Sequence, residues 1–142
     1  MKTPENATQG HCYCNAIQFE VTFPTEFCCH CHCEDCRQTH GAPFVTWTGV
    51  PKSQFRLLSG EDKVQRYQSH PGVYWGFCSV CGTSMFCDYD EAPEKIYITV
   101  SNLDGSLDRE PDGHVSFEEH VPWLSVCDNL PKYRGKTKER VE

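Results

Sequence analysis

The spacing of the cysteines constrains the fold of this chain more than any other feature. Seven of the eleven cysteines lie in three short motifs, which are Cys12-x-Cys14, Cys31-x-Cys33-x-x-Cys36 and Cys78-x-x-Cys81. A closed structural zinc site takes four protein ligands, whereas a catalytic site usually takes three and leaves one position for water or substrate. Because seven is four plus three, the cysteine count predicts two zinc sites, one closed and one open.

The length and composition fit a single domain that uses metal for part of its stability. A chain of 142 residues is within the usual size of one domain. Its hydrophobic content is 38% without glycine, and a typical domain has about 45–50% when glycine is counted. Structural zinc can contribute on the order of 10 kcal/mol of apparent binding free energy to folding. We therefore expect the bound metal to compensate for a modest core.

The charge pattern argues against a nucleic-acid partner. The net charge is −7, which disfavours binding to the phosphates of a duplex. The only candidate basic patch lies near the C-terminus, at Lys132, Arg134, Lys136, Lys138 and Arg140. Chain ends are commonly frayed, so residues 134–142 are expected to form a flexible, solvated tail.

The N-terminal residues 1–9 are expected to be a disordered lead-in. They contain no apolar stretch of the kind that a secretory signal requires, and no part of the chain approaches the ~18–20 apolar residues of a membrane span. We therefore expect a cytoplasmic protein without a membrane partner. In that compartment the cysteines are reduced thiols and metal ligands rather than disulfides. The sequence does not indicate an oligomeric state.

Short β-strands dominate the predicted secondary structure. Residues 17–23 alternate between apolar and polar side chains, with Ile17, Phe19, Val21 and Phe23 on one face, which is typical of a strand. A short helix is expected at 34–40. Further strands are expected at residues 28–33, 44–47, 55–58, 64–67, 73–77, 84–87, 96–100 and 114–117. The pattern predicts an all-β domain over residues 10–133, made of short sheets joined by metal.

The closed zinc site is assigned to Cys12, Cys14, Cys78 and Cys81. Two cysteines separated by two residues can direct both sulfurs at one metal ion. Gly82 follows the second pair, where the turn needs a positive φ, and Asn15 follows the first pair as the next most tolerant residue. The alternative is that these four cysteines are only buried thiols.

The open zinc site is assigned to Cys31, Cys33 and Cys36. Zinc held there would deprotonate an incoming thiol or polarise a carbonyl oxygen. Arg37 either contacts a substrate carboxylate or is an ordinary surface arginine. Cys29 lies on the same strand face as Cys31 and is a possible fourth ligand. In that case the zinc would be structural, and the protein would be a non-catalytic binding module.

The remaining cysteines and histidines near these motifs are expected to support them. His30 and His32 alternate away from the cysteine face, so His32 should pack or hydrogen-bond behind the metal site rather than bind the metal. Cys28, Cys87 and Cys127 are expected to be small buried side chains. A redox-responsive role for Cys28 and Cys29 is a weaker alternative.

Three segments, taken in order along the chain, resemble the glutathione-dependent formaldehyde-activating enzyme family, whose domain is shared with centromere protein V. The segments are Gly10–Cys14, Cys31–Arg37 followed by Gly41, and Phe77–Thr83. The C-terminal residues His114-Val115, Pro122-Trp123, Asp128 and Leu130-Pro131 are similar to the closing motif of that family. The resemblance covers nearly all of the chain, from about residue 10 to residue 133.

The resemblance implies a β-tent-like (Mss4-like) fold of layered antiparallel sheets with the same two zinc sites. It also implies carbon–sulfur lyase chemistry, in which S-hydroxymethylglutathione is interconverted with glutathione and formaldehyde. A related thiol–aldehyde adduct would suit the site equally well, since an open zinc–thiolate centre does not by itself select glutathione. By motif position, Phe44, His114 and Trp123 are candidates for the glutathione pocket, although each is also a plausible core residue.

Overall fold

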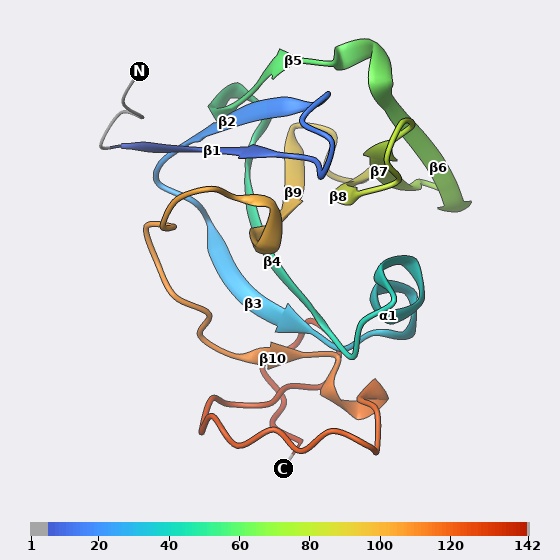
Figure 1. The fold of residues 1–142 in the computed structure, drawn as a ribbon. Helices are drawn as coiled ribbons and strands as arrows, with labels where there is room; N and C mark the ends of the chain where they lie inside the picture. Colours follow the sequence, from blue (N-terminus) through green and yellow to red (C-terminus); the bar gives the residue numbers. More distant parts are fainter. Residues whose placement is uncertain (1–5, 142) are drawn as a thin grey trace.

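The computed structural model describes residues 6–141, which form two β-sheets, one short α-helix and an irregular C-terminal segment (Figure 1). The smaller sheet is antiparallel and has three strands. In spatial order these are β1 (Ala7–His11), β2 (Gln18–Thr22) and β5 (Phe55–Ser59).

The larger sheet contains seven strands. In spatial order these are β10 (His114–Val115), β3 (Phe27–Cys31), β4 (Val45–Pro51), β9 (Lys95–Thr99), β8 (Ser84–Tyr89), β7 (Val73–Cys78) and β6 (Val64–His70). All neighbouring pairs are antiparallel except β10 and β3, which run parallel. The helix α1 (Glu34–His40) follows β3 directly. The expected layered, all-β architecture is therefore confirmed.

The seven-stranded sheet separates two hydrophobic clusters. Val50, Phe86 and Ile98 belong to the first cluster, together with Phe19 of β2. Their strand neighbours Cys87 and Tyr97 belong to or pack on the second cluster. Because successive side chains of a strand point to opposite faces, the two clusters lie on opposite faces of the sheet. The first cluster lies between the two sheets, and the second faces α1 and the C-terminal segment.

The N-terminal region is more ordered than expected. Residues 7–9, predicted to be part of a disordered lead-in, form β1 and pair with Glu20–Thr22 of β2. Gly10 allows this pairing, since a Cβ atom there would lie 2.4 Å from Phe19 Cζ. The rest of the expected lead-in, residues 1–5, lies outside the described residues.

The C-terminal segment, residues 131–141, is also packed rather than free. The Tyr133 N–H donates to His114 O at 2.8 Å, and the Ser116 N–H donates to Gly135 O at 2.8 Å. Tyr133 forms a β-bridge with Arg140. The segment that was expected to be a flexible tail thus has backbone partners at His114 and Ser116 that the charge pattern does not reveal. Residue 142 lies outside the described part.

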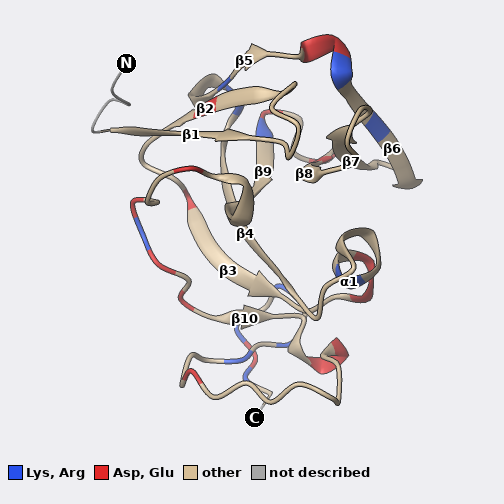
Figure 2. Cartoon of the chain, viewed as in Figure 1, with Lys and Arg blue, Asp and Glu red and all other residues tan. Residues whose placement is uncertain are grey.

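Basic and acidic residues alternate in this lower part of the fold (Figure 2). Arg134 Nε lies 3.2 Å from Glu139 Oε2, and the Glu118 carboxylate accepts the Gly135 N–H at 2.8 Å. Arg134 of the C-terminal segment thus has an acidic neighbour. Within residues 6–141, no helix has the length and apolar character needed to cross a membrane.

Candidate metal centres and substrate cavity

Four cysteines from two distant turns meet at one end of the molecule. The sulfurs of Cys12, Cys14, Cys78 and Cys81 all lie within 4.8 Å of one another. Cys12 Sγ lies 3.6 Å from Cys14 Sγ, which in turn lies 3.9 Å from Cys78 Sγ. Two sulfurs bound tetrahedrally to one zinc at ~2.3 Å are separated by roughly 3.8 Å. The spacing of this four-cysteine cluster therefore fits a zinc ion.

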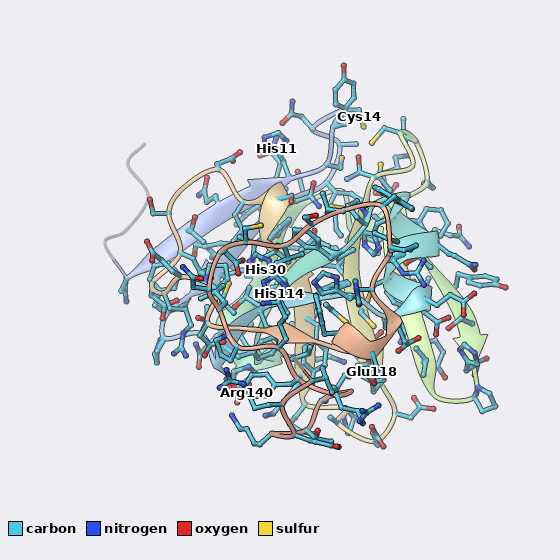
Figure 3. All side chains as sticks on the ribbon, turned by 90° about the horizontal axis from the view of Figure 1, so that it is seen from below. His11, Cys14, His30, His114, Glu118 and Arg140 are labelled. Atoms are coloured by element: carbon cyan, nitrogen blue, oxygen red, sulfur yellow. The ribbon has the colours of Figure 1, made fainter. Side chains whose placement is uncertain are left out.

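The backbone around the four-cysteine cluster is arranged as in a metal-binding turn. The Ile17 N–H donates to Cys12 Sγ at 3.3 Å, and the Val80 N–H donates to Cys78 Sγ at 3.4 Å. Such bonds favour the thiolate form of the sulfur. Asn15 has φ 66° and Gly82 has φ 80°, so both residues adopt the left-handed conformation that the sequence predicts. Cys14 lies at the periphery of the molecule (Figure 3).

The remaining three motif cysteines form a second cluster where β3 meets α1. The sulfurs of Cys31, Cys33 and Cys36 lie within 4.8 Å of one another. Cys33 is the N-cap of α1, and its sulfur accepts the Cys36 N–H at 3.2 Å. Hydrogen bonds from the thiols of Cys33 and Cys36 lower the pKa of Cys31 to about 3. The hydrogen bond that Cys36 shares with Cys31 raises the pKa of Cys36. The cluster thus stabilises thiolate, the form that binds metal.

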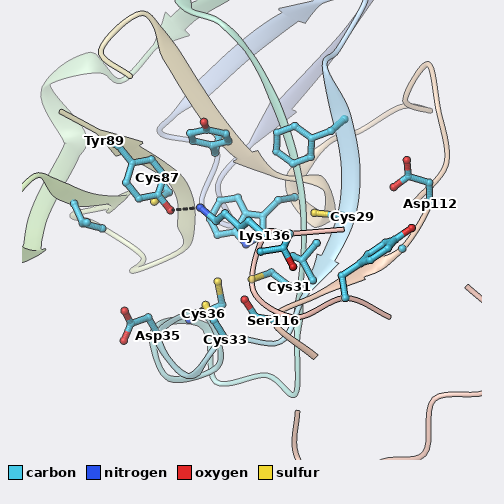
Figure 4. Close-up of a pocket in the computed structure, with 18 of the residues that line it drawn as sticks. Cys29, Cys31, Cys33, Asp35, Cys36, Cys87, Tyr89, Asp112, Ser116 and Lys136 are labelled. Carbon is cyan, nitrogen blue, oxygen red and sulfur yellow. Dashed lines mark hydrogen bonds between the residues drawn. The ribbon is translucent and has the colours of Figure 1, made fainter. Parts of the chain in front are cut away.

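No fourth metal-binding side chain joins this three-cysteine cluster within residues 6–141. Cys29 lines the same cavity as the cluster, but its sulfur is not grouped with the other three. In Figure 4, Cys29 lies on β3 apart from the three cysteines of the cluster. Burial raises the pKa of Cys29 to about 12, which keeps it a neutral thiol. In this structure, the donors at the cluster are three sulfurs.

A cavity of about 480 Å³ opens directly onto the three-cysteine cluster. Aromatic side chains from several strands of the larger sheet line one part of it, namely Phe27, Trp47, Trp75, Tyr89 and Tyr97. Burial raises the pKa of Tyr89, so its hydroxyl stays protonated at neutral pH. The C-terminal segment forms another part of the wall and places Lys136 in the cavity.

A hydrogen-bonded histidine chain lies behind the cluster, as expected for His32. His32 Nε2 lies 2.8 Å from His114 Nδ1, and His114 Nε2 lies 2.8 Å from Asp128 Oδ2. Both histidines are buried. If the Asp128 carboxylate accepts the His114 Nε2–H, His114 Nδ1 accepts from His32. This chain fixes the ring of the residue that lies between Cys31 and Cys33.

Atoms of His30, His114 and Asp128 also lie close enough together to hold a metal ion, and Figure 3 places the two histidines side by side. The 2.8 Å contact between His114 and Asp128 is a hydrogen-bond distance. Two ligands on one zinc with bonds of ~2.0–2.1 Å would be roughly 3.3 Å apart. The group is therefore a hydrogen-bond network in this structure.

The other expected substrate contacts do not line the cavity. Arg37 directs its Nε at His32 O, 3.3 Å away, and so supports the loop of the cluster. Phe44 packs between His30 and His32, with ring centroids 5.0 Å from each. Trp123 is 71% exposed. Together with the buried His114, these residues lie outside the cavity at the three-cysteine cluster.

The three cysteines that were expected to be small buried side chains differ in their exposure. Cys28 and Cys87 are buried, as predicted, but Cys127 is exposed, so that prediction was wrong. Neither the aromatic walls of the cavity nor the place of Lys136 in it was predicted from the sequence. Trp47 and Trp75 did carry a signal, since both lie on the face of predicted strands that includes other apolar residues. Lys136 carried none.

Comparisons with known proteins agree with this arrangement of cysteines. Residues 7–119 match the family described as glutathione-dependent formaldehyde-activating enzyme. A Schizosaccharomyces pombe protein described as an uncharacterized lyase is 28% identical over 90 residues, which are 63% of this chain and 64% of that protein. The chain thus matches a little under two thirds of the length of this curated relative. The crystal structure of a Rhodobacter sphaeroides protein superimposes with a TM-score of 0.59 at 26% identity, covering 71% of this chain and 92% of that one. Since the family match spans most of the chain and contains all seven clustered cysteines, the chain belongs to the glutathione-dependent formaldehyde-activating enzyme family.

Proposed function

We propose that this chain is a carbon–sulfur lyase that acts on a thiol–aldehyde adduct. In the simplest case it interconverts S-hydroxymethylglutathione with glutathione and formaldehyde in the cytoplasm. The observation that carries the proposal is the three-cysteine cluster, which faces an aromatic cavity and has no fourth metal-binding side chain in its group within residues 6–141. Membership of the family and the lyase description of the yeast relative support the same class of reaction.

Both cysteine clusters are proposed to hold zinc, because thiolate-rich donor sets favour this metal. The four-cysteine cluster satisfies the ligand count of a structural ion. A zinc ion held by Cys31, Cys33 and Cys36 would supply Lewis acidity toward an aldehyde oxygen and would favour the thiolate form of a bound thiol.

The proposed reaction is balanced without an oxidant or a reductant. In the lyase direction the C–S bond of the adduct breaks, the adduct hydroxyl loses its proton, and the sulfur takes up one proton to give the free thiol. The aromatic walls of the cavity keep bulk water away from the adduct. The protonated Tyr89 hydroxyl supplies a hydrogen-bond donor within the cavity.

A non-catalytic zinc module is the second candidate, and Cys29 is the residue that would favour it. This cysteine lines the cavity next to the cluster. Its sulfur would have to join the three-sulfur group to close the metal shell. Such a protein would bind two zinc ions but would not bind glutathione at the metal.

The test is the rate of exchange between formaldehyde and glutathione, measured by exchange NMR with the zinc-loaded protein. We expect the wild type to accelerate exchange and Cys33→Ser to abolish the acceleration. Cys127→Ser is the matched control, because it removes an exposed thiol outside both clusters. Acceleration that persists in Cys33→Ser after loss of metal from that site would contradict the proposal.

A further inference from the structure

The C-terminal segment forms one wall of the cavity at the three-cysteine cluster, although it lies beyond the part of the chain that matches the family. The family match ends at residue 119, while Tyr133, Lys136, Thr137 and Lys138 line the cavity. This wall is therefore a feature of this chain that the family match does not account for.

The wall is held in place by backbone hydrogen bonds to β10 and to the turn that follows it. The Phe117 N–H donates to Tyr133 O at 3.0 Å, and the Ser116 N–H donates to Gly135 O at 2.8 Å. The Gly135 N–H in turn donates to both carboxylate oxygens of Glu118, at 2.8 Å and 2.9 Å. Gly135 therefore anchors the chain through both its N–H and its carbonyl group, immediately before Lys136.

Lys136 extends from this anchor into the cavity. Its Nζ donates to the Tyr89 hydroxyl at 3.3 Å and lies 4.7 Å from the centroid of the Tyr89 ring. Figure 4 draws its side chain between Tyr89 and the three cysteines. The ammonium group thus lies beside Tyr89 at the wall of the cavity that opens onto the cluster, while Lys136 as a whole is exposed.

The partners of Lys136 in this structure are weak ones for an ammonium group. Among the described residues, the ion pairs formed by lysines involve Lys52, Lys63 and Lys95, and none involves Lys136. Asp35 and Asp112 also line the cavity, and in Figure 4 their carboxylates lie toward opposite edges of the view, away from Lys136. A neutral phenol is a weaker acceptor than a carboxylate, because hydrogen bonds that involve an ionised group are roughly twice as strong as those between neutral groups.

Among the described residues that line the cavity, Lys136 and Lys138 are the only cationic side chains, and Lys138 lies over the Tyr133 ring. Trp47, Trp75 and Tyr97 present aromatic surface, which suits the carbon atoms of a ligand. An anionic group attached to a metal-bound thiol would therefore find its strongest partner at Lys136, with the Tyr89 hydroxyl as a second donor.

We propose that Lys136 binds a carboxylate of the thiol half of the substrate, so that the site selects thiols that carry a carboxylate a few bonds from the sulfur. The assignment rests on the proposed function, since it assumes that a thiol reaches the metal held by the three cysteines. Lys136 is then a specificity-determining residue for the reaction.

Three small thiols with the same reactive group and different charge test this selection. They are mercaptoacetate, which is anionic, 2-mercaptoethanol, which is neutral, and cysteamine, which is cationic. Each is titrated into the cobalt-loaded full-length protein, and the change in the visible cobalt–thiolate spectrum gives its Kd. Each thiol is compared only with itself, in wild type and in Lys136→Met, so differences in thiol acidity cancel.

We expect Lys136→Met to weaken mercaptoacetate about tenfold, a modest loss for a hydrogen bond between charged groups. The affinity for 2-mercaptoethanol should stay within about twofold, which also shows that the variant is folded and loaded with metal. Cysteamine should bind no more weakly to Lys136→Met than to the wild type. Lys138→Met is the matched control, since Lys138 lies on the same wall but packs over Tyr133, and it should leave mercaptoacetate nearly unchanged.

Three results would overturn the assignment, and they have different meanings. An unchanged affinity for mercaptoacetate in Lys136→Met would refute carboxylate recognition while leaving thiol binding intact. An equal loss in Lys138→Met would show that the charge of the wall acts as a whole and that Lys136 has no specific role. If none of the three thiols changes the cobalt spectrum of the wild type, the proposed function itself fails.

Discussion

At the scale of single residues, Cys33 has two roles, and substitution by serine should remove only one of them. Its sulfur is one of three in the cluster and also caps α1 by accepting the Cys36 N–H. Serine is among the best N-cap residues, so Cys33→Ser should keep the helix and lose a metal ligand. We expect the metal content to fall from two ions per chain to one, with a change in unfolding free energy from the cap itself of less than about 1 kcal/mol.

Elemental analysis by mass spectrometry measures the metal content, and circular dichroism checks the fold. Cys29→Ser serves as the control and should retain both ions, because Cys29 is outside the three-sulfur group. Loss of one ion from Cys29→Ser would instead make Cys29 a ligand.

His32 gives a prediction about pH at the same scale. Burial lowers the pKa of His32 from 6.5 to about 4 in the folded protein. The unfolded chain therefore binds more protons at this residue between about pH 6.5 and pH 4, and folded-state stability must fall as the pH falls through this window. In His32→Gln, which keeps a nitrogen donor near the position of Nε2, this contribution is absent.

Between pH 7 and pH 5, the wild type should therefore lose about 1–2 kcal/mol more unfolding free energy than His32→Gln does. Urea unfolding of both proteins in the same buffers measures the difference, so that proton uptake by the cysteines largely cancels. Parallel curves for the two proteins across this range would mean that His32 is not buried in its neutral form.

At the scale of elements, the turns that carry the four-cysteine cluster depend on two left-handed residues. Gly82 has φ 80°, and no atom lies within 4 Å of the point that a Cβ would occupy. Gly82→Ala should then cost only the backbone penalty of this conformation, about 1–2 kcal/mol. Gly82→Asn should cost less, because asparagine tolerates the left-handed region, as Asn15 does in the partner turn. Denaturant unfolding of the zinc-loaded variants measures both values, and equal losses for alanine and asparagine would point to packing as the cause.

The elements that were predicted correctly carry a signal in their own sequence. Strand β2 alternates, with Phe19 and Val21 buried, and the predicted helix at 34–40 matches α1. Strand β1 was missed because residues 7–10 contain one apolar side chain and gain their order from pairing with β2. The C-terminal segment was missed for a similar reason, since its partners are backbone groups of β10 and the following turn.

The two cysteine clusters were predictable because metal ligands follow short-range spacing rules, and the structure groups the same seven sulfurs. The cavity was not predictable in the same way. Its aromatic walls come from strands that are far apart in sequence, and the order of strands in the larger sheet brings them together. Periodicity within a strand tells which residues share a face, but it does not tell which strands are neighbours.

At the scale of the whole molecule, the two cysteine clusters are associated with opposite faces of the seven-stranded sheet. Cys12 and Cys78 belong to the hydrophobic cluster between the sheets. Cys31 and Cys36 belong to the hydrophobic cluster that faces α1. The four-cysteine cluster also ties the turn after β1 to the turn after β7. We therefore expect Cys78→Ser to lower unfolding free energy by several kcal/mol, because structural zinc contributes on the order of 10 kcal/mol to folding.

Cys33→Ser should have a much smaller effect on the melting temperature than Cys78→Ser, because its metal connects residues that are already close in sequence. Calorimetry of the two zinc-loaded variants makes the comparison directly. If Cys33→Ser proves the more destabilising of the two, the division into a structural and a reactive site is wrong.

The central claim is that the metal at Cys31, Cys33 and Cys36 has three protein ligands and one exchangeable position. Diffraction from zinc-loaded crystals at the zinc absorption edge tests it most directly. The predicted result is two zinc ions per chain, one bound by four sulfurs at ~2.3 Å and the other by three sulfurs and a water molecule or an added thiol. A fourth sulfur from Cys29 at the second ion would contradict the claim and would leave the protein as a structural zinc module.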